Sequence, residues 1–599
     1  MMTPCPEFQK ISKVLILGNG LSAFETARQL IALGYEVLLI NTEDNNLPNG
    51  LVPASTRGTP DPCRELRERL EKDSQFTQIT QTTLSAIEGF AGEFQAQLTS
   101  GPKKWTETVG AVVLAAELNS EGRFEGYHLR PSEQIMVLEH LTNPFFPSPQ
   151  PFSLRERFQP EGLPGGLSPP ACKPSGLEAG PEAAGREGVL MALKPDSYIA
   201  FLTGLEEEGN VADMARTLSL ALEIRQVYQS QVCVFCRNVK VAEEGLERLY
   251  QTCRDEGVLF FKFDQEGPEM NRSDHLVSLY FTDSVLGQPF ELTPDLLVID
   301  SVHGLPQDIQ ALALSAQIGL DESGFLQPAN VHLLPQASRR AGIFIAGPGK
   351  GPMLPRTCLE EARATALLVH HFFKGEPSDH LKREVTVDKG LCTICLTCLR
   401  FCPHQAIGWT HRIVIHPLAC QRCGICASEC PMDAIQISGY SDQEVEAKLA
   451  VMQQSWQRSE SNQPKVVIFG CQRSAGVAWE EVQGSGFKVQ GDVEFISLPC
   501  AGKMDPDQVL KALVMGADGV LVLACPEENC QSIHGNTYAR GRIQEVQEVV
   551  AEAGLNPERI RFEHLSSNMV WFLKEIIGQF LKEIQEKTES RQQSWTASI

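Results

Sequence analysis

The stretch that decides the fold spans residues 392–431, and it reads C-T-I-C-L-T-C-L-R-F-C-P from Cys392 and C-Q-R-C-G-I-C-A-S-E-C-P from Cys420. Each run has the spacing C-x2-C-x2-C-x3-C-P, in which three closely spaced thiolates hold three irons of one four-iron cluster. The fourth cysteine, just before proline, binds the other cluster. The spacing therefore predicts two [4Fe–4S] cubanes with crossed ligands, as in two-cluster ferredoxins.

The crossed pattern assigns every cysteine of the two runs to one cubane. The first cubane is assigned to Cys392, Cys395, Cys398 and Cys430, and the second to Cys402, Cys420, Cys423 and Cys426. Zinc is the alternative metal, but it prefers two CxxC pairs that lie far apart and form one tetrahedron. Eight cysteines in a doubled pattern of three plus one fit zinc poorly.

The two runs are an internal repeat with a period of 28 residues, since residues 385–387 match 413–415 and Ala406 matches Ala434. Each half is expected to form a short strand, a cluster loop and a turn of helix. His404 and His416 lie beside the cluster loops, and each is expected to be a surface residue or a neighbour of a cluster rather than a ligand. Such a module passes single electrons and has no substrate of its own.

The composition is that of a folded, acidic chain. Its 599 residues predict roughly four domains, and its formal net charge of −23 argues against nucleic acid or an anionic membrane surface as the main partner. The first ten residues lack the apolar core of a signal peptide, and no run approaches the ~18 apolar residues of a membrane span. The 19 cysteines cluster at metal spacing, which favours the cytoplasm, with membrane contact only through a partner protein.

The N-terminal part has the pattern of a dinucleotide-binding lobe. A buried strand at 13–17 is followed by the turn G-N-G-L-S-A, a helix at 24–33 and a second strand at 37–40. This context is the one that the dinucleotide fingerprint requires, with glycine where the pyrophosphate approaches and the helix N-terminus facing the phosphates. The candidate cofactor-binding residues are Gly18, Gly20, Leu21, Ser22, Ala23 and Asn41.

Asn41 departs from this fingerprint, because an acidic residue normally ends the second strand and binds a ribose. Glu43 and Asp44 come two and three positions late. A bound dinucleotide and an inherited fold with an altered or empty site both remain open.

The middle of the chain predicts a linker and then a second lobe. Residues 143–187 contain ten prolines and six glycines, which predicts a long exposed linker, with a partner-wrapping segment as the alternative. Strands and helices then alternate, which predicts a second nucleotide-binding-like lobe inserted in the first. The expected elements are a strand at 198–202, a helix at 212–228, a strand at 231–236, a helix at 241–256, a strand at 258–263 and a β-pair of 276–282 with 296–299.

A buried strand at 109–116 is expected to continue the first lobe, which is expected to close with a later strand in the stretch 341–346. A glycine-rich turn and a helix at 357–373 follow. This second corner, facing a phosphate or a flavin, adds the candidate cofactor residues Gly347, Gly349, Lys350 and Gly351.

Four cysteines in the C-terminal part are placed to meet at one rim. Strands at 466–470, 493–498 and 519–524 are each followed by a cysteine, and the carboxyl ends of parallel strands share one edge. Four thiolates there suit a [2Fe–2S] cluster, and ordinary buried cysteines are the alternative. The candidate ligands are Cys471, Cys500, Cys525 and Cys530.

Two helices complete the expected C-terminal part. Asp505 is placed to cap a helix at 505–515. The amphipathic stretch at 569–584 is expected to pack on its own domain.

Residues 10–440 resemble the A subunit of heterodisulfide reductase, a flavoprotein of the thioredoxin-reductase-like class. The Gly18-Asn19-Gly20 turn, the Gly347 corner and the insert at 392–430 carry this resemblance. It implies FAD as cofactor and a ferredoxin part that passes electrons onward.

Three marks of that family are absent. The strand at 109–116 leads to Glu117 where the family has an Ala-Thr-Gly that touches the flavin. The helix from Ala212 lacks a Cys-x-x-Cys-Cys cluster, and an early cysteine-rich segment is reduced to Cys63. Simple relay, rather than flavin-based branching of electron pairs, is expected.

The C-terminal part resembles the delta subunit of methyl-viologen-reducing hydrogenase. The stretches G-C-Q-R-S-A-G from Gly470, P-C-A-G-K-M-D from Pro499 and G-A-D-G-V-L-V-L-A-C-P-E-E-N-C from Gly516 carry this resemblance. It implies one [2Fe–2S] cluster that links an electron donor to heterodisulfide reductase. Where the family often has a second cysteine, this chain has Ser474.

Together these patterns predict an α/β protein. A Rossmann-like, thioredoxin-reductase-like body with an inserted second lobe precedes an α+β two-cluster ferredoxin domain and a C-terminal α/β [2Fe–2S] domain. The expected parts are a lobe at 10–142, a linker at 143–187, a second lobe at 188–300, the closing part at 301–380, a ferredoxin domain at 381–440, a connector at 441–463 and a C-terminal domain at 464–586.

The expected function is that of an electron-transfer subunit of a multi-subunit oxidoreductase, and no independent bond-making chemistry is expected. Its partners would be the other subunits of a heterodisulfide reductase-like complex. The B subunit of the quinone-interacting membrane-bound oxidoreductase has the same order of fused parts, so the other subunits of that complex are also expected as partners. A stand-alone FAD- and NAD(P)H-dependent enzyme and a scaffold that has lost its flavin are the alternatives.

Overall fold

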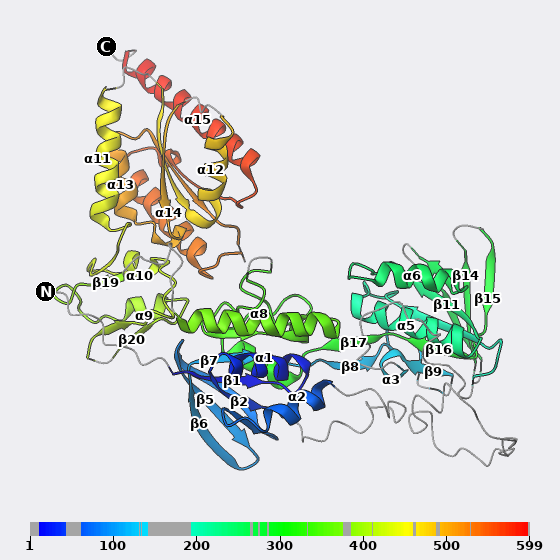
Figure 1. Cartoon of the computed structure of the whole chain (residues 1–599). Helices are drawn as coiled ribbons and strands as arrows, with labels where there is room; N and C mark the ends of the chain where they lie inside the picture. Colours follow the sequence, from blue (N-terminus) through cyan, green and yellow to red (C-terminus); the bar gives the residue numbers. More distant parts are fainter. Residues whose placement is uncertain are drawn as a thin grey trace, which may run out of the picture. The chain divides into compact units, whose positions relative to one another are not determined.

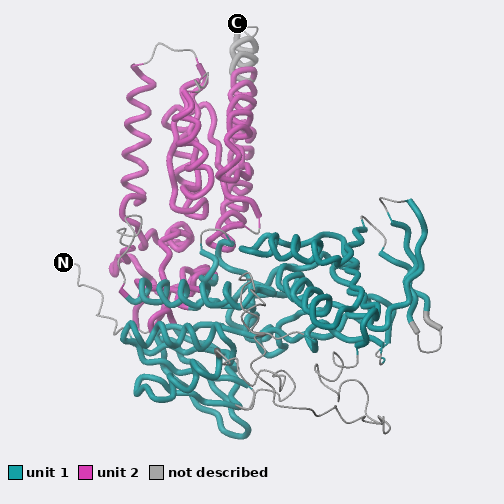
Figure 2. The backbone as a smooth tube through the Cα atoms, turned by 45° about the vertical axis from the view of Figure 1, so that its right-hand side comes forward, with its two compact units in different colours: residues 1–89, 93–338, 343–373 teal, residues 90–92, 339–342, 374–599 magenta. Residues whose placement is uncertain are grey.

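The structure is a computed structural model whose chain divides into two compact units, described here one at a time. Unit 1 comprises residues 1–89, 93–338 and 343–373, and unit 2 comprises 90–92, 339–342 and 374–599 (Figure 2). The linker predicted at 143–187, together with Glu43 and Asp44, lies outside the described residues. The structure describes residues 11–42, 62–130, 132, 134–141, 193–263, 267–273, 276–283, 287–331, 334–374, 385–409, 411–458, 463–486, 491–527 and 529–596.

The first lobe of unit 1 is built on a parallel sheet of order β18-β7-β1-β2-β3. Buried apolar runs such as Val14–Leu17 explain why the inner strands lie in the core of the lobe, whereas β3 at the edge is partly exposed. The strands are β1 (Lys13–Leu17), β2 (Glu36–Ile40), β3 (Phe76–Ile79), β7 (Ala111–Leu114) and β18 (Ile343–Ile345).

Helices and a smaller sheet complete this lobe (Figure 1). Helix α8 buries one face, including Ala362, Ala366 and Val369, in the core that α1 and the sheet share. The helices are α1 (Leu21–Ala32), α2 (Pro62–Leu70) and α8 (Pro355–Lys374), and the smaller sheet contains β4 (Thr83–Phe90), β5 (Glu93–Ser100) and β6 (Lys103–Val109).

The second lobe of unit 1 has its own parallel sheet, of order β12-β11-β10-β16-β9. Its strands are β9 (Ile135–Val137), β10 (Tyr198–Thr203), β11 (Gln231–Cys236), β12 (Leu259–Lys262) and β16 (Leu296–Ile299). The helices are α3 (Leu138–Leu141), α5 (Val211–Val227) and α6 (Leu246–Asp255), and β8 (Asn119–Gly122), β17 (Ser301–Gly304) and α7 (Gln307–Ser315) adjoin the lobe in the chain.

The predicted β-pair of 276–282 with 296–299 is wrong. β14 (Leu276–Thr282) pairs antiparallel with β13 (Glu269–Ser273) and β15 (Pro289–Leu292) in a separate sheet, while β16 pairs parallel with β10. All four side chains of β16 are buried, which is the environment of a strand that is covered on both faces.

The cysteine-rich segment, residues 385–440, opens the described C-terminal part of unit 2. Its outer strands β19 (Val385–Val387) and β22 (Ile435–Ile437) pair antiparallel, and so do β20 (Ile407–Trp409) and β21 (Ile413–Ile415). Each half also has one short helix, α9 (Thr397–Phe401) or α10 (Ile425–Ser428). The two halves are therefore interleaved rather than consecutive, because the first strand pairs with the last.

The C-terminal domain is a four-stranded parallel sheet of order β24-β23-β25-β26 between helices. Asp505 caps α13, accepting a hydrogen bond from the Asp507 N–H at 2.9 Å. The elements are α11 (Asp442–Arg458), β23 (Lys465–Cys471), α12 (Val477–Gly484), β24 (Asp492–Leu498), α13 (Pro506–Val514), β25 (Gly519–Ala524), α14 (Gly535–Glu552), β26 (Ile560–His564) and α15 (Val570–Thr596).

Helix α15 packs on its own domain, as its amphipathic pattern predicted. Leu573, Ile576, Ile577 and Phe580 are buried in a core with strand residues of the sheet. Among the described helices, none combines the length and apolar content needed to cross a membrane.

Candidate functional site

The structure brings the four cysteines assigned to the first cubane around one cavity, here called the first cavity. Cys392, Cys395 and Cys398 come from the first run, and Cys430 comes from the end of the second run. The Cys395 side chain is exposed, whereas Cys398 is 6% exposed. The crossed assignment thus corresponds to residues that lie together.

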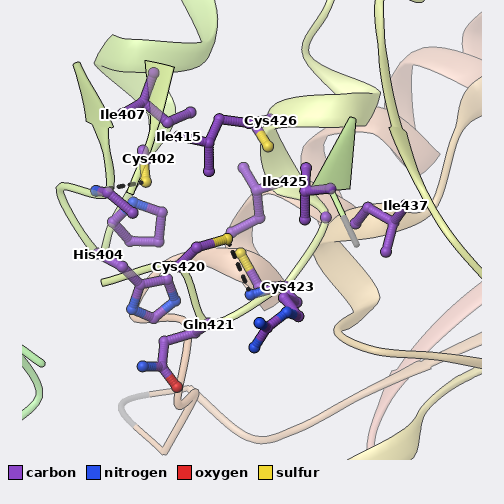
Figure 3. Close-up of a pocket in the computed structure, with 15 residues that line it drawn as sticks. Cys402, His404, Ile407, Ile415, Cys420, Gln421, Cys423, Ile425, Cys426 and Ile437 are labelled. Atoms are coloured by element: carbon purple, nitrogen blue, oxygen red, sulfur yellow. Dashed lines mark hydrogen bonds between the residues drawn. The ribbon is translucent and has the colours of Figure 1, made fainter. Parts of the chain in front are cut away.

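The four cysteines assigned to the second cubane line another cavity, the second cavity. Cys420, Cys423 and Cys426 surround it with Cys402, which the first run contributes (Figure 3). Gly424 has a left-handed φ of 87° just before α10 begins, and this turn of the chain carries Cys423 and Cys426 onto the cavity wall.

Backbone N–H groups point at sulfur in the same way in both halves. The Ala406 N–H donates to Cys402 Sγ at 3.4 Å, and the Ala434 N–H donates to Cys430 Sγ at 3.3 Å. These two bonds occupy equivalent positions of the 28-residue repeat. Donors aimed at sulfur stabilise the thiolate, which is the form that binds iron.

The chemistry of these donor sets fits iron–sulfur clusters. Burial raises the pKa of Cys398 to about 11 and that of Cys423 to about 12, so thiolates at these places need a cationic group beside them. No three His, Cys, Asp or Glu side chains in the described ranges are arranged to hold a single metal ion, and the sulfurs of each set surround a cavity instead. A cluster bound there would store and release one electron at a time.

The third set of cysteines gathers at one edge of the C-terminal sheet. Cys471 ends β23, Cys500 follows β24, and Cys525 and Cys530 follow β25; all four are at most 9% exposed. Contact among the sulfurs and burial together raise the pKa values of Cys500 and Cys525. The same contacts lower the pKa values of Cys471 and Cys530. Four sulfurs in contact at one edge of the sheet, two of them favoured as thiolates, fit a small iron–sulfur cluster.

A glycine is required beside this third set. A Cβ on Gly535 would lie 2.4 Å from Cys500 Sγ and 3.5 Å from Cys530 Sγ. Ser474, at the position where a further cysteine was expected from the resemblance, is buried in the π-helical turn Gln472–Gly476 that follows β23. Four cysteines therefore remain for this site.

The second cavity and the third set of cysteines lie next to each other. Cys423 packs against the cluster formed by Cys500, Cys525 and Cys530. One cysteine assigned to the second cubane therefore touches the cysteines assigned to the [2Fe–2S] cluster. Because these side chains are in contact, no other part of the protein lies between Cys423 and the third set of cysteines.

Two buried cations join the cysteine-rich segment to the C-terminal domain, and sequence reasoning did not find them. Lys503 is 1% exposed; its carbonyl oxygen accepts a hydrogen bond from the Ser428 hydroxyl of the cysteine-rich segment at 2.6 Å, and its Nζ lies 3.3 Å from Asp442 Oδ1. Arg542 donates to the carbonyl oxygens of Gly502 at 2.9 Å and Met504 at 2.8 Å and pairs with Glu429, the neighbour of Cys430. Buried charges of this kind fix one arrangement of the surrounding loops, because losing a partner is costly.

His404 is buried, although a surface position was one of the two environments expected for it. Its side chain is 4% exposed and lines the second cavity, and neither ring nitrogen has a hydrogen-bond partner among the described residues. His416 is half-buried. The surface alternative is thus wrong for His404, and its place beside a cluster site agrees with the other alternative.

The glycine turn of the first lobe has the geometry of the dinucleotide fingerprint. α1 begins at Leu21, directly after the turn, so the N–H groups of its first residues, including Ser22, face the end of β1. A Cβ on Gly18, where φ is 150°, would lie 2.1 Å from the Ala115 oxygen and 3.3 Å from the Ala23 Cβ. Asn41 is buried, and its Oδ1 has no hydrogen-bond partner in the described part of the chain.

Glu117 occupies the space that the fingerprint keeps open at Gly20. A Cβ on Gly20 would lie 1.6 Å from Glu117 Oε1, so the carboxylate stands where a pyrophosphate approaches the backbone in this fold. The Glu117 carboxylate and the pyrophosphate of a dinucleotide would therefore compete for the space beside Gly20. The residues as arranged therefore do not fit FAD, and no electron-transfer step is assigned to it.

The second glycine corner meets the first but directs its lysine elsewhere. A Cβ on Gly347, where φ is 72°, would lie 2.2 Å from Ser22 Oγ. Gly349 and Gly351 flank Lys350, whose Nζ donates to the Pro335 oxygen at 2.8 Å and pairs with Glu361. The lysine is thus committed within the protein.

The turn after β10 in the second lobe, here called its phosphate-type loop because nucleotide phosphates bind at this place in α/β folds, is closed by the lobe's own carboxylate. The Gly204 N–H after β10 donates to Asp300 Oδ2 at 2.7 Å, and the Tyr127 hydroxyl donates to Asp300 Oδ1 at 3.0 Å. Burial raises the pKa of Asp300 to about 6. A dinucleotide phosphate that used this loop would have to displace the carboxylate.

The fold, the cysteine-lined cavities and a family match together define an iron–sulfur protein of the oxidoreductase class. Residues 413–436 match the family described as "4Fe-4S binding domain", and residues 466–587 match "Methyl-viologen-reducing hydrogenase, delta subunit". The chain thus joins a ferredoxin-type segment to a hydrogenase delta-subunit domain.

Curated relatives cover both parts of this fusion. The A subunit of the ferredoxin:CoB-CoM heterodisulfide reductase of Methanosarcina mazei is 23% identical over 420 residues, covering 68% of this chain and 52% of its own length. The iron–sulfur D subunit of the F420-non-reducing hydrogenase of Archaeoglobus profundus is 29% identical over 122 residues, covering 20% of this chain and 89% of its own length. The chain spans about half the length of the heterodisulfide reductase relative and is similar to it over the larger part of its own.

Solved structures add little to this picture. A thioredoxin reductase of T. acidophilum has 10% sequence identity and a TM-score of 0.36, with 60% of this chain and 97% of that chain covered. At this score the likeness carries no weight. The fold class, two α/β lobes followed by a ferredoxin-type segment and an α/β domain, rests on the sheet orders described above.

Proposed function

We propose that this chain is an electron-transfer subunit that relays single electrons between partner proteins through two [4Fe–4S] clusters and one [2Fe–2S] cluster. The observation that carries the proposal is the grouping of twelve cysteines into three sets of four, with Cys423 of the second set touching the third. A row of adjacent one-electron centres suits transfer along the chain.

The first cubane would be the outer end of the relay. Cys395 is exposed, and the apolar side chains around this end of the segment are between 36% and 47% exposed; these are Leu391, Ile394, Leu399 and Met432. Grouped exposed apolar residues mark protein–protein contact sites. A partner that presents its own redox centre would dock at this rim and exchange electrons through Cys395 or its neighbours.

The partners are proposed from the printed names of the relatives. The relative of the larger part belongs to a heterodisulfide reductase, and the C-terminal relative belongs to a hydrogenase. These names support placing this chain in a heterodisulfide reductase-like complex in the cytoplasm, with any membrane contact made by another protein of the complex. A quinone-interacting oxidoreductase complex is the alternative, and it rests only on the order of the fused parts in the sequence. The alternative of a stand-alone FAD- and NAD(P)H-dependent enzyme has no support, because Glu117 and Asp300 close both phosphate-type loops.

Metal analysis of the anaerobically purified full chain tests this function. Two cubanes and one [2Fe–2S] cluster contain about ten irons and about ten sulfides per chain, and dithionite should reduce them to species visible by electron paramagnetic resonance. The same preparation should not oxidise NADH. A colourless protein, or one that holds zinc in these places, would contradict the proposal.

A further inference from the structure

The two cavities of the cysteine-rich segment differ at one position of the repeat. His404 follows the Cys402-Pro403 pair and lines the second cavity, and 28 residues later Met432 follows the Cys430-Pro431 pair and lines the first cavity. The flanking N–H···S bonds from Ala406 and Ala434 are the same in both halves. The chain thus contains its own comparison between a side chain that can donate a hydrogen bond and one that cannot.

The imidazole of His404 lacks the partners that a buried polar group normally has. The side chain is 4% exposed, and neither Nδ1 nor Nε2 is hydrogen-bonded within the described residues. Buried side-chain nitrogens nearly always have a partner, and a neutral imidazole has one N–H to donate. The missing partner must therefore be a group that fills the space beside the ring.

That space is the second cavity. Figure 3 shows the ring of His404 on the cavity wall with Cys402 and Cys420. Arg473 and Cys530, of the C-terminal domain, also lie near enough to act on the ring electrostatically. His404 therefore lines the second cavity and is close enough to Cys530 of the third set to interact with it electrostatically.

We propose that His404 donates its ring N–H to a sulfur of the second cubane and makes this cubane easier to reduce than the first. The proposal rests on the proposed function, since it requires clusters in both cavities. A reduced cluster carries one more negative charge than the oxidised cluster, so a donor at sulfur stabilises the reduced form more and raises the reduction potential. Met432, at the equivalent place, offers no such donor.

The consequence is a preferred place for an electron at equilibrium. With clusters in both cavities, the hydrogen bond from His404 would favour an electron on the second cubane, beside the third set of cysteines, over one on the first cubane. His404 acts on the reduction potential of the second cubane through its hydrogen bond, and it neither gains nor loses a proton when the cubane is reduced.

The test is an anaerobic redox titration of the full holoprotein, followed by electron paramagnetic resonance. His404→Met should lower the potential of the second cubane, with a change of about tenfold in its reduction equilibrium, or 59 mV for one electron, and with iron content unchanged. Met432→His is the matched reverse exchange, and His404→Asn, which retains an N–H donor, should keep most of the wild-type potential.

A second readout makes the contact visible directly. In protein labelled with ¹⁵N-histidine, pulsed resonance of the reduced chain should show nitrogen coupled to the second cubane, and His404→Met should abolish this coupling. An unchanged potential, or an absent coupling in an iron-replete wild type, would overturn the inference. Loss of four irons in His404→Met would overturn it as well, because His404 would then be needed to hold the cluster. Iron-free wild-type protein would instead refute the proposed function itself.

Discussion

Gly20 and Gly535 show two ways in which this chain uses a residue without a side chain. At Gly20 the space of a Cβ is taken by the carboxylate of Glu117, and at Gly535 it is taken by the sulfur of Cys500. Both glycines allow a close approach, but one admits an anion of the protein itself and the other admits a potential metal ligand. A glycine signature thus indicates that something approaches the backbone, and only the structure shows what it is.

The largest effect is predicted for loss of a cysteine assigned to a cluster. Cys430→Ala should remove the cubane that Cys392, Cys395 and Cys398 also hold, although Cys430 lies in the other run. Iron should fall from about ten to about six atoms per chain. Metal analysis with resonance spectra of the reduced protein measures this.

The matched controls for this prediction are in the same chain. Cys402→Ala should remove the other cubane and leave the signal that Cys430→Ala abolishes. Cys233 is buried in the second lobe, outside the three sets, and Cys233→Ala should leave the iron content unchanged. If Cys430→Ala and Cys402→Ala removed the same signal, the crossed assignment would be wrong.

The glycine side of the comparison predicts a gain of binding. Glu117→Gly should open the space at Gly20 and remove a negative charge, so the variant should bind FAD where the wild type does not. Fluorescence of flavin released from purified protein incubated with FAD measures the content per chain.

The variant Glu117→Gln separates bulk from charge. It keeps the size of the side chain, so it should bind FAD less well than Glu117→Gly if the space matters. One FAD per chain in the wild type would contradict the claim that Glu117 excludes the flavin at Gly20. An empty Glu117→Gly variant would show that another feature excludes the flavin.

The buried cation beside the clusters predicts a loss of stability. Arg542→Leu leaves Glu429 and two carbonyl oxygens without their donor, and breaking a buried ion pair costs about 3–5 kcal/mol. Arg540, two residues earlier on α14, pairs with Glu527 at the surface, and surface pairs contribute at most about 1 kcal/mol. Melting of the anaerobic holoprotein should therefore shift strongly for Arg542→Leu and little for Arg540→Leu, and equal shifts would contradict this account.

The closed loop of the second lobe predicts a pH effect, which is the smallest of the four. Burial raises the pKa of Asp300 from 3.8 to about 6, so its contribution to stability is full at low pH and is lost as the pH rises through 6. The loss amounts to about 3 kcal/mol, from about two pKa steps. Relative to Asp300→Asn, the wild type should lose unfolding free energy between about pH 4 and pH 6, and parallel pH profiles would argue against it.

The two cubane sets could be predicted from sequence because their spacing is local, whereas the third set was predicted from strand ends that share one edge of a parallel sheet. Three ligands of each cubane lie within seven residues, and the fourth follows from the crossing rule. The same holds for the glycine turn after β1, since a strand, a turn and a helix are adjacent in the chain. The division into seven parts stays a prediction, because the structure itself separates only two units.

The contacts that close the lobes could not be predicted, because they join residues far apart in the chain. Glu117 meets Gly20 across almost a hundred residues, and no local pattern marks it beyond the departure from the family motif. The electrostatic effect of Arg473 and Cys530 on His404 likewise comes from residues that lie about seventy or more positions later in the chain.

The wrong pairing of 276–282 with 296–299 had a signal that could have prevented it. The run Leu296–Ile299 is apolar at every position, which is typical of a central parallel strand. The strand at 276–282 is instead interrupted by the polar Ser278 and ends on the polar Thr282.

The crossing of Cys402 and Cys430 has a consequence beyond electron transfer. Each proposed cubane would tie the two halves of the segment together as a covalent crosslink does, because its ligands come from both runs. Crosslinks that close a loop restrict the unfolded chain. A cell short of iron would then hold this segment as a loose polypeptide open to proteases, and assembly of the two inorganic cores would decide whether the chain survives.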